Sequence, residues 1–364
     1  MSKIEELISE LCPKGINSPP LSELLLLQRG ERVTKSDLLP DGQIPVVSGG
    51  KGYMGFVRDS NREMNTITIA QYGAAGYVAW QNQAFWANDV CFSAVLKTDL
   101  LQYRFLYHFL KSRQEFIFSI SNRVAVPYSI DSKRLLSMTI PLPPLEVQRE
   151  IVSILDKFTQ LEAELEAELE ARKYQLEYYR QNLLTFDVSE VPNSFLGDIY
   201  DFQYGKGNTI PTKGGKYPVY GSNGAVGSHN EFNSEDAPVI GHIGAYAGVV
   251  NWADGEHFVT YNGVICKIKA GFDPRFGYHL LMKQNLRELA NEGSQPFVSY
   301  DKLKSVVVQL PTINKQKELA VLLDSLEALT SDISMGLPAE IAARRKQYEY
   351  YRNELLTFKE LETA

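Results

Sequence analysis

Apolar residues recur at intervals of three and four over residues 144–184, which is the spacing of one face of an α-helix. Ile151, Leu155 and Phe158 lie on this stripe. A helix of that extent is about 60 Å long at the usual helical rise. A second helical pattern near the C-terminus should break at residues 335–338, which read MGLP, because glycine and proline interrupt helices.

The remaining residues form short apolar runs that are separated by glycines. Residues 66–70 and 264–268 are two such runs, rich in β-branched side chains and bounded by turn-forming residues. This pattern predicts β-strands joined by tight turns. The chain therefore has an α+β pattern in which a globular segment and a helical segment each occur twice.

The two halves of the chain are repeats of one another. Residues 171–186 read ARKYQLEYYRQNLLTF, and residues 343–358 read ARRKQYEYYRNELLTF. Upstream, LPPLEVQREI at residues 142–151 recurs as LPTINKQKEL at residues 310–319, and both copies continue to a Leu-Asp pair. Matches of this length indicate an internal pseudo-two-fold repeat.

The globular parts match more faintly. Residues 44–50 are similar to residues 217–223, and residues 73–80 are similar to residues 244–252. Each copy then has a Tyr-His pair in a stretch with helical character. The helices have thus stayed alike while the globular parts have diverged. This indicates that the helices have the same function in both halves, whereas the globular parts have similar functions on different targets.

These motifs resemble the conserved regions of type I restriction-modification specificity (S) subunits. The start of the chain, IEELISELCPKG at residues 4–15, is similar to theirs as well, and the resemblance covers essentially the whole sequence. Two modest departures occur in the repeated helix: Leu176 stands where the second copy has Tyr348, and Tyr174 stands where it has Lys346.

The resemblance implies two target-recognition domains held apart by two long antiparallel coiled-coil helices. The expected boundaries are residues 1–142 for the first target-recognition domain with its short N-terminal helix, 143–186 for the first spacer helix, 187–310 for the second domain, and 311–364 for the second spacer helix and tail. Each domain is expected to read one half of a split double-stranded DNA target.

The resemblance also implies partners. Two methyltransferase subunits are expected to dock on this chain and to methylate adenine, and restriction subunits are expected to join them. The S subunit itself is expected to catalyse nothing and to bind no cofactor, because S-adenosylmethionine belongs to the methyltransferase subunits.

Residues 161–171 consist of a repeated Leu-Glu-Ala-Glu unit. Four residues add about 6 Å to a helix and rotate its far end by only about 40° beyond a full turn. We therefore hypothesise that the number of units sets the gap between the two DNA half-sites. The alternative is that the run is simply a solvated acidic face.

Base contacts require hydrogen-bonding side chains at loop tips, with glycines where the backbone approaches closely. Such loops in the first globular part contribute Ser48, Lys51, Tyr53, Gln71, Tyr72, Asn122 and Arg123 as candidate DNA-binding residues. Those in the second contribute Lys206, Asn208, Ser222, Asn223, His229, Asn230, His242, Ser294 and Gln295. The alternative is that these glycines only form hairpin turns, which the polar residues cap. Residues 205–210 lack the third glycine of a dinucleotide-binding motif.

A second set of candidates forms the helix and partner interface, comprising Ile151, Leu155, Phe158, Leu165, Tyr178, Tyr179, Leu319, Leu323, Tyr350 and Tyr351. We interpret the paired tyrosines as packing residues between helices, or as a surface for the methyltransferase subunits, rather than as a platform for stacked bases.

Charge complicates the DNA interpretation, because the net charge is -7. The distribution is uneven: residues 19–139 contain thirteen basic and ten acidic side chains, residues 140–186 five and nine, and residues 187–307 ten and thirteen. Only the first globular part therefore has the basic balance that phosphate contacts favour.

The three cysteines are dispersed, and the five histidines form no HxxxH pair. This pattern argues against disulfides and against a metal site. No apolar run is long enough to cross a bilayer, so we expect a cytoplasmic protein.

Two alternatives remain open. A DNA methyltransferase with an unrecognised active site would need an Asn/Asp/Ser-Pro-Pro-aromatic motif, and the Pro-Pro pairs at residues 18–21 and 142–145 lack the aromatic residue. A coiled-coil scaffold protein without DNA reading would explain the helices, but it leaves the two diverged globular parts unexplained.

Overall fold

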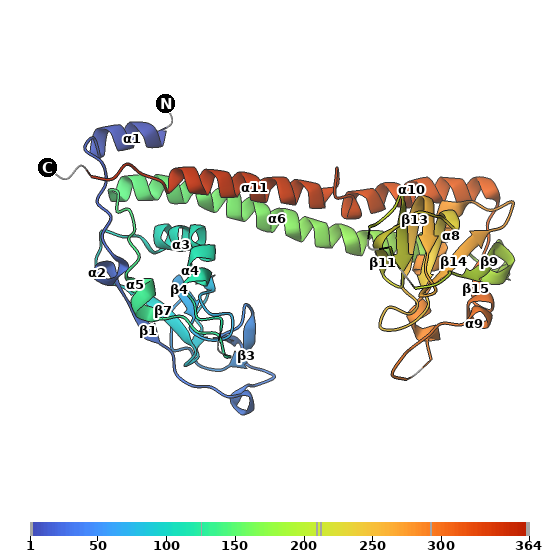
Figure 1. The fold of residues 1–364 in the computed structure, drawn as a ribbon, viewed down its shortest axis with the longest axis horizontal. Coiled ribbons are helices and arrows are strands. Elements are labelled where there is room, and N and C mark those ends of the chain that lie inside the picture. Colours follow the sequence, from blue (N-terminus) through green and yellow to red (C-terminus); the bar gives the residue numbers. More distant parts are fainter. Residues whose placement is uncertain (1–2, 125, 209, 212, 292, 362–364) are drawn as a thin grey trace. The chain divides into compact units, whose positions relative to one another are not determined.

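The structure is a computed structural model that describes residues 3–124, 126–208, 210–211, 213–291 and 293–361 (Figure 1). The chain forms two compact units. The first unit is Met1–Glu164 with Ile341–Ala364, and the second is Leu165–Glu340. The four predicted segments divide the chain differently, because the structure groups each part of a long helix with the globular domain on which it packs.

The first unit contains a short N-terminal helix, a β-rich domain and helices that cover it. Its elements up to the long helix are α1 (Lys3–Leu11), α2 (Leu21–Leu24), β1 (Leu25–Arg29), η1 (Lys35–Asp37), β2 (Ile44–Val47), β3 (Tyr53–Val57), β4 (Thr66–Ala70), β5 (Val78–Gln81), β6 (Trp86–Ala87), β7 (Cys91–Leu96), α3 (Tyr103–Ser112), α4 (Gln114–Ser119) and α5 (Ser132–Leu136).

Two small sheets form the first domain. The larger one is antiparallel with the order β1-β7-β4-β5, and the smaller one has the order β3-β2-β6 with a parallel β2–β6 pair. The strand predicted at residues 66–70 is confirmed as β4, and its burial is nearly complete. Helix α3 packs against β4 and β5.

The second unit repeats this plan with longer strands. Its elements are β8 (Asn193–Phe195), α7 (Leu196–Ile199), β9 (Tyr200–Tyr204), β10 (Tyr217–Gly221), β11 (Gly224–His229), β12 (Ser234–Gly241), β13 (Val250–Val259), β14 (Gly263–Ile268), α8 (Pro274–Lys283), η2 (Leu286–Leu289), α9 (Tyr300–Lys304), β15 (Val307–Gln309) and α10 (Ile313–Ser331).

The second domain joins into one sheet what the first domain builds as two. Its six strands have the order β11-β10-β13-β12-β14-β9, and β8 pairs with β15 apart from them. The long strand β13 pairs with β12 along most of its length and with β10 at its end, so it corresponds to both β5 and β6 of the first domain. The strand predicted at residues 264–268 is confirmed within β14.

Two long helical segments complete the fold. Helix α6 (Leu145–Leu183) is continuous for 39 residues, which confirms the predicted helix at 144–184. Helix α10 ends at Ser331 and α11 (Leu337–Leu355) begins after an interruption, as the glycine and proline near residue 336 predict. Among the described residues, no helix is both long and apolar enough to cross a membrane.

In the first unit, α6 and α11 lie side by side in opposite directions (Figure 1). Phe158 of α6 contacts the rings of Tyr348 and Tyr351, whereas Glu162, one turn later, binds Arg345, which is earlier in α11. This order confirms that the two helices are antiparallel in this unit.

The predicted apolar stripe of α6 is buried against the core of its own domain. Ile151 and Leu155 are fully buried together with Phe105 and Leu106 of α3. Leu323 occupies the matching place in the core of the second unit. Burying each such side chain stabilises the fold by about 1.5–3 kcal/mol, so the stripe fastens the helix to the domain.

Candidate nucleic-acid interface

Three loops meet at one end of the first domain. The amide of Ala74 donates to the carbonyl oxygen of Gly49 at 2.7 Å, and Tyr72 and Asn122 each form a β-bridge with Ser129. We call this surface the first tip and define it as Arg29, residues 48–53, 71–74, Asp89 and described residues of 122–129. The structure thus brings the candidate residues of all three predicted loops of this domain together.

The first tip presents polar and basic side chains. Lys51, Asn122 and Arg123 are exposed, and the guanidinium of Arg123 lies 5.8 Å from the ring centre of Tyr128. The Oε1 atom of Gln71 is buried and has no hydrogen-bond partner in the part of the chain that the structure describes. A buried amide oxygen without a partner is costly, so this atom is suited to accept a hydrogen bond from a ligand.

The corresponding end of the second domain has the same arrangement of backbone hydrogen bonds. The carbonyl oxygen of Gln71 accepts from the amide of Ile130 at 3.0 Å, and that of His242 accepts from the amide of Val298 at 3.0 Å. Both residues directly follow the central strand of their sheet. Gln71 and His242 therefore occupy equivalent positions.

Two more pairs of positions correspond in the same way. The amides of Gly30 and Gly205 donate to equivalent carbonyl oxygens of β7 and β14 at 3.1 and 3.0 Å. A Cβ atom on either glycine would lie within 2.6 Å of backbone atoms at the end of β6 or β13, so only glycine fits there. Equivalent positions next to these contacts hold Arg29 and Asp89 in the first domain, and Tyr204 and Tyr261 in the second.

The second domain has a cavity of about 330 Å³ at this end, lined by Tyr204, His242, Ile243, Tyr261, Gln295 and Phe297. The ring centres of Tyr204 and His242 are 4.2 Å apart. We call the surface around this cavity the second tip and define it as residues 204–208, 221–224, 242–244, Tyr261 and 294–297, all of which the structure describes.

Most candidate residues of the second domain lie at the second tip. The amide of Tyr261 donates to Gly207 at 2.8 Å, which places the loop of Lys206 and Asn208 beside the cavity. The carbonyl oxygen of Ser222 lies against Gly241, directly before His242. The turn of Ser222 and Asn223 and the loop of Ser294 and Gln295 thus adjoin His242.

His229 and Asn230 do not join this group. The β10–β11 hairpin turns at Gly221 and Gly224, whereas His229 pairs with Tyr217 at the opposite end of the hairpin. The His229 ring stacks on Phe258 at 4.2 Å, and its Nδ1 accepts from the amide of Glu231. These contacts give His229 a local structural role, so the structure does not support the interpretation of this pair as part of the same surface.

Each domain is joined to its helix by the same set of residues, which we call the anchor. The first anchor is Trp80, Arg104, Tyr107, His108 and Asp156, and the second is Trp252, Arg275, Tyr278, His279 and Asp324. In both, the histidine Nε2 lies beside the aspartate Oδ1, at 2.8 Å in the first and 2.7 Å in the second.

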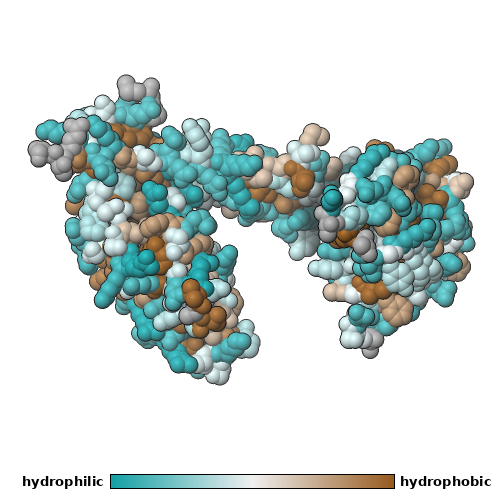
Figure 2. Space-filling view, viewed as in Figure 1, coloured by the Kyte–Doolittle hydropathy of each residue, from teal (hydrophilic) through white to brown (hydrophobic). Residues whose placement is uncertain are grey.

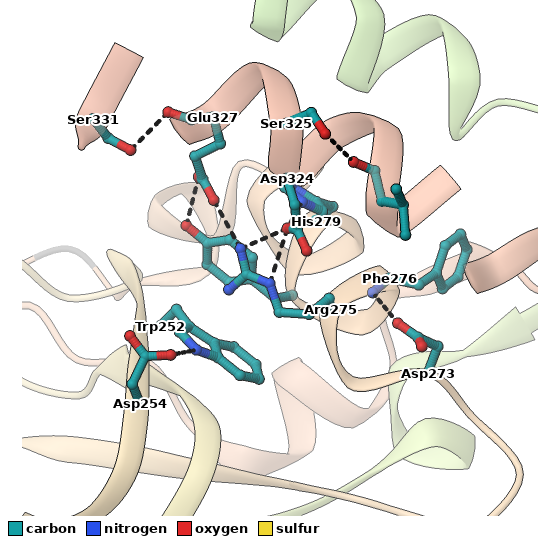
Figure 3. Close-up of polar contacts among 12 residues, drawn as sticks. Trp252, Asp254, Asp273, Arg275, Phe276, His279, Asp324, Ser325, Glu327 and Ser331 are labelled. Atoms are coloured by element: carbon teal, nitrogen blue, oxygen red, sulfur yellow. Dashed lines mark hydrogen bonds and ion pairs between the residues drawn. The ribbon is translucent and has the colours of Figure 1, made fainter. Parts of the chain in front are cut away.

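The arginine of each anchor also lies over an indole ring. The guanidinium carbon is 4.5 Å from the ring centre of Trp80 in the first anchor and 4.6 Å from that of Trp252 in the second (Figure 3). Arg104 and Arg275 bind the aspartate of the same anchor. Since the aspartate belongs to the long helix and the other groups to the domain, each anchor orients a domain on its helix.

The second anchor contains one further carboxylate. Glu327 accepts from Tyr278 at 2.9 Å and from Arg275 at 3.0 Å (Figure 3), and Arg180 of α6 approaches it at 3.5 Å. His279, Asp324 and Glu327 place possible metal ligands within 4.8 Å of one another. Two guanidinium groups already neutralise these carboxylates, so the cluster is held together by ion pairs.

Burial and hydrogen bonding fix the protonation states in the anchors. Burial lowers the pKa of His108 and of His279, which favours the neutral ring. Burial alone would raise the pKa of Asp156, but hydrogen bonds from His108 and Arg104 outweigh it and lower this pKa. Each anchor therefore pairs a neutral imidazole with a charged carboxylate.

The glutamine near the start of each repeated helix forms a second connection between the helix and its domain, which we call a joint. The Oε1 of Gln148 accepts from the amide of Gln102 at 2.9 Å, and its Nε2 donates to the carbonyl oxygens of Leu100 and Pro143. Gln316 repeats the contact to the amide before α8, at Asp273, at 3.0 Å. This explains physically why the motif has glutamine in both copies.

The candidate interface residues of the helices divide into two groups. Leu165 is buried like the other aliphatic members, and Tyr351 stacks on Phe158 at 5.5 Å. Tyr178 and Tyr350, however, are 65% and 61% exposed. Packing between helices does not account for these two rings, because each contacts only its tyrosine neighbour edge-on among the described aromatic residues, and their use as a surface for partner subunits stays a prediction.

Sequence reasoning missed several of these residues. The anchors had a signal, since the Tyr-His pair, the Leu-Asp pair and the tryptophan all lie in repeated segments, but the repeat does not show that they meet. Arg29, Asp89, Tyr204, Tyr261 and Phe297 gave no signal, because the segments around them have diverged.

Most of the visible surface is hydrophilic, with hydrophobic residues in separate patches (Figure 2).

Comparison with known proteins identifies relatives along most of the chain. The profile of a family described as "Type I restriction modification DNA specificity domain" matches residues 13–171 and again residues 189–343. A putative type I restriction enzyme specificity subunit of Haemophilus influenzae is 30% identical, with 93% of this chain and 94% of that protein aligned. The EcoprrI specificity subunit of Escherichia coli is 32% identical, over 74% of this chain and 73% of that protein.

Solved structures show the same fold. A type I restriction-modification S subunit from M. genitalium has a TM-score of 0.66 at 21% identity, over 94% of this chain and 96% of that one. A chain from a structure described as addressing complex assembly and conformational transition of the type I system has a TM-score of 0.59 at 12% identity, over 94% and 98%.

Proposed function

Because the chain belongs to the family of type I restriction-modification DNA specificity proteins, we propose that it is the DNA-recognition subunit of such a complex. Each globular domain reads one half of a bipartite double-stranded target, and the subunit is not itself an enzyme. The alternatives of a scaffold protein and of a methyltransferase have no support among its relatives.

One observation in particular supports this function. The two tips share their backbone but differ in side chains: Gln71 in the first domain corresponds to His242 in the second, and Arg29 corresponds to Tyr204. Each base pair presents its own pattern of donors, acceptors and methyl groups in the major groove. Different side chains on one frame therefore read different bases.

Lysines beside each tip complete the surface. Lys51 and Lys206 are exposed, and cations at such loops bind phosphates and fix the position of the protein on DNA. With a net charge of -7, the chain is expected to bind DNA strongly only when partner subunits add basic surface.

The long helices set the spacing between the half-sites and provide the docking surface for partners. Two methyltransferase subunits bind the chain, one for each repeat, and bring S-adenosylmethionine with them. The exposed rings of Tyr178 and Tyr350 occur at matching places in both repeats, which suits a surface used twice by identical partners. Restriction subunits join the same complex, which acts on DNA in the cytoplasm.

Single-molecule sequencing of genomic DNA tests the proposed function. The chain is co-expressed with its cognate methyltransferase subunit in a host that lacks such modification, and cells without this chain are the control. We expect methylated adenines in a split motif, with two short defined halves around a fixed run of unspecified bases, only when the chain is present. Absence of a new motif, with the complex shown to assemble by size-exclusion chromatography, would exclude DNA reading.

A further inference from the structure

The cavity of the second tip is unusual because aromatic rings remain exposed around it. Tyr261 and Phe297 are 44% and 42% exposed, and Ile243 and His242 also line the cavity. Exposed rings that surround an open cavity leave apolar surface in contact with water, which is the arrangement of a ligand site rather than of a finished core. We call this cavity the aromatic pocket.

The rings of the pocket are held in fixed positions. The Tyr204 ring stacks on Tyr300 with centres 3.7 Å apart and also contacts His242. The amides of His242 and Val298 hold the strand ends together, and Ile243 forms a β-bridge with Phe297. A pocket with such support can select a ligand by shape, because its walls do not collapse into it.

His242 offers one hydrogen-bonding atom to this pocket. Its Nδ1 lies 3.0 Å from the carbonyl oxygen of Val298, which only accepts, so Nδ1 has the proton. Burial lowers the pKa of His242, so the ring is neutral at pH 7. Nε2 is then an acceptor, and it has no partner within the described part of the chain.

The first domain shows that the pocket is not required by the fold. The equivalent positions hold Arg29 in place of Tyr204, Asp89 in place of Tyr261 and Ser129 in place of Phe297. The corresponding strands of the first domain still follow one another in the same order, although they are divided between two sheets. The aromatic walls therefore belong to what the second domain recognises and not to how it is built.

Base-pair chemistry indicates one ligand for such a pocket. In the major groove only thymine presents a methyl group, and the paired adenine presents a donor in its 6-amino group. Guanine presents only acceptors, which would face the lone pair of Nε2. We propose, resting on the proposed function, that the aromatic pocket binds the methyl-bearing edge of one thymine in the half-site read by the second domain.

Deoxyuridine tests this proposal, because it lacks only the 5-methyl group of thymidine. The complex of the full chain with its methyltransferase subunit is titrated, at one fixed salt concentration, with duplexes in which each thymine of the target is replaced in turn. We expect one position in the second half-site where the replacement weakens binding about 3- to 10-fold. If every replacement in that half-site is tolerated, or if the half-site contains no A·T pair, the proposal is wrong.

A variant of the pocket links the effect to its residues. The Phe297→Ala complex should bind the thymine and uracil duplexes equally, at about the affinity of the unchanged complex for uracil DNA. The control is Phe232→Ala, because Phe232 is also exposed but packs on Tyr217 at the far end of the β10–β11 hairpin. It should retain the uracil effect. Loss of the effect in both variants, or in neither, would overturn the assignment.

The two levels of the proposal fail in different ways. A complex that methylates a split motif but ignores uracil has the proposed function without the thymine pocket. A complex that methylates no split motif at all lacks the proposed function itself.

Discussion

At the scale of single residues, the two anchors differ in the environment of the histidine Nδ1 atom. The Nδ1 of His108 lies 3.1 Å from the hydroxyl of Tyr348, whereas the Nδ1 of His279 is buried and has no hydrogen-bond partner among the described residues. Leu176 is the reason, because it stands in the first copy of the repeat where Tyr348 stands in the second. A difference noted in the sequence as a modest departure thus decides whether a buried nitrogen is satisfied.

Removing that hydroxyl should destabilise the first unit. In Tyr348→Phe, His108 loses a partner while the ring packing stays, so the free energy of unfolding should fall by about 1–2 kcal/mol. Tyr351→Phe is the matched control, since Tyr351 packs on the same Phe158 and its hydroxyl makes no hydrogen bond among the described residues. Urea titration measures both, and equal losses would contradict the role of this bond.

The anchor histidines also predict a dependence of stability on pH. Burial holds the pKa of His108 and of His279 below the usual 6.5, so the unfolded chain takes up protons first as the pH falls. Their contribution to stability is present above about pH 6.5 and is lost below it. The midpoint of unfolding should therefore decrease as the pH is lowered from 7.5 to 5.5. His108→Gln should make this dependence of the midpoint on pH weaker. An unchanged slope would show that other groups cause it.

At the scale of elements, α6 is the one that the sequence describes best. Its period, its length and its repeated ends all come from local patterns, so both of its ends could be predicted to within one residue. The strands at residues 66–70 and 264–268 followed from the same kind of pattern. The tips could not be predicted in this way, because loops distant in sequence form them only after the sheets have folded.

The repeated Leu-Glu-Ala-Glu run lies where α6 passes from one unit to the other, since the division falls between Glu164 and Leu165. Deleting Leu165–Glu168 shortens the helix by about 6 Å with a rotation of about 40°. Because base pairs are spaced by about 3.4 Å, the gap in the methylated motif should shorten by about one to two base pairs with both halves unchanged. Sequencing of the methylated genome reads the gap directly.

Replacing Leu165–Glu168 by a second helix-forming sequence of the same length is the control for this deletion. It should leave the gap unchanged, because length and not composition sets the spacing. A deletion variant that methylates sites with the original gap would refute the spacing role of α6.

At the scale of the whole molecule, two recognition surfaces should act independently. Gln71→Ala removes the amide at the first tip, and His242→Ala removes the imidazole at the second. Each variant should relax one half of the motif only, with a loss of discrimination of about 10- to 100-fold at the affected base. The methylated motifs of the two variants give the test, and relaxation of both halves by either substitution would contradict it.

The sequence of the whole chain predicted the duplication, but not which positions of the two domains correspond. Arg29 and Tyr204 share no chemistry and no flanking motif, and only the hydrogen bonds of Gly30 and Gly205 reveal their equivalence. Likewise, His229 satisfied every sequence criterion for a loop-tip contact and yet lies at the wrong end of its hairpin. Whether a polar residue can contact DNA depends on where the folded domain places it, and the local sequence does not show that place.

The repeated joints have a consequence for how such chains change over generations. Each domain meets its helix through the same glutamine contact, at Gln148 or Gln316, and through the same histidine–aspartate pair. A genetic exchange that replaces everything between two joints keeps the bonding at both ends intact. New sequence specificities can therefore arise by recombination of whole cassettes, without any need to remodel the helices or the partners that recognise them.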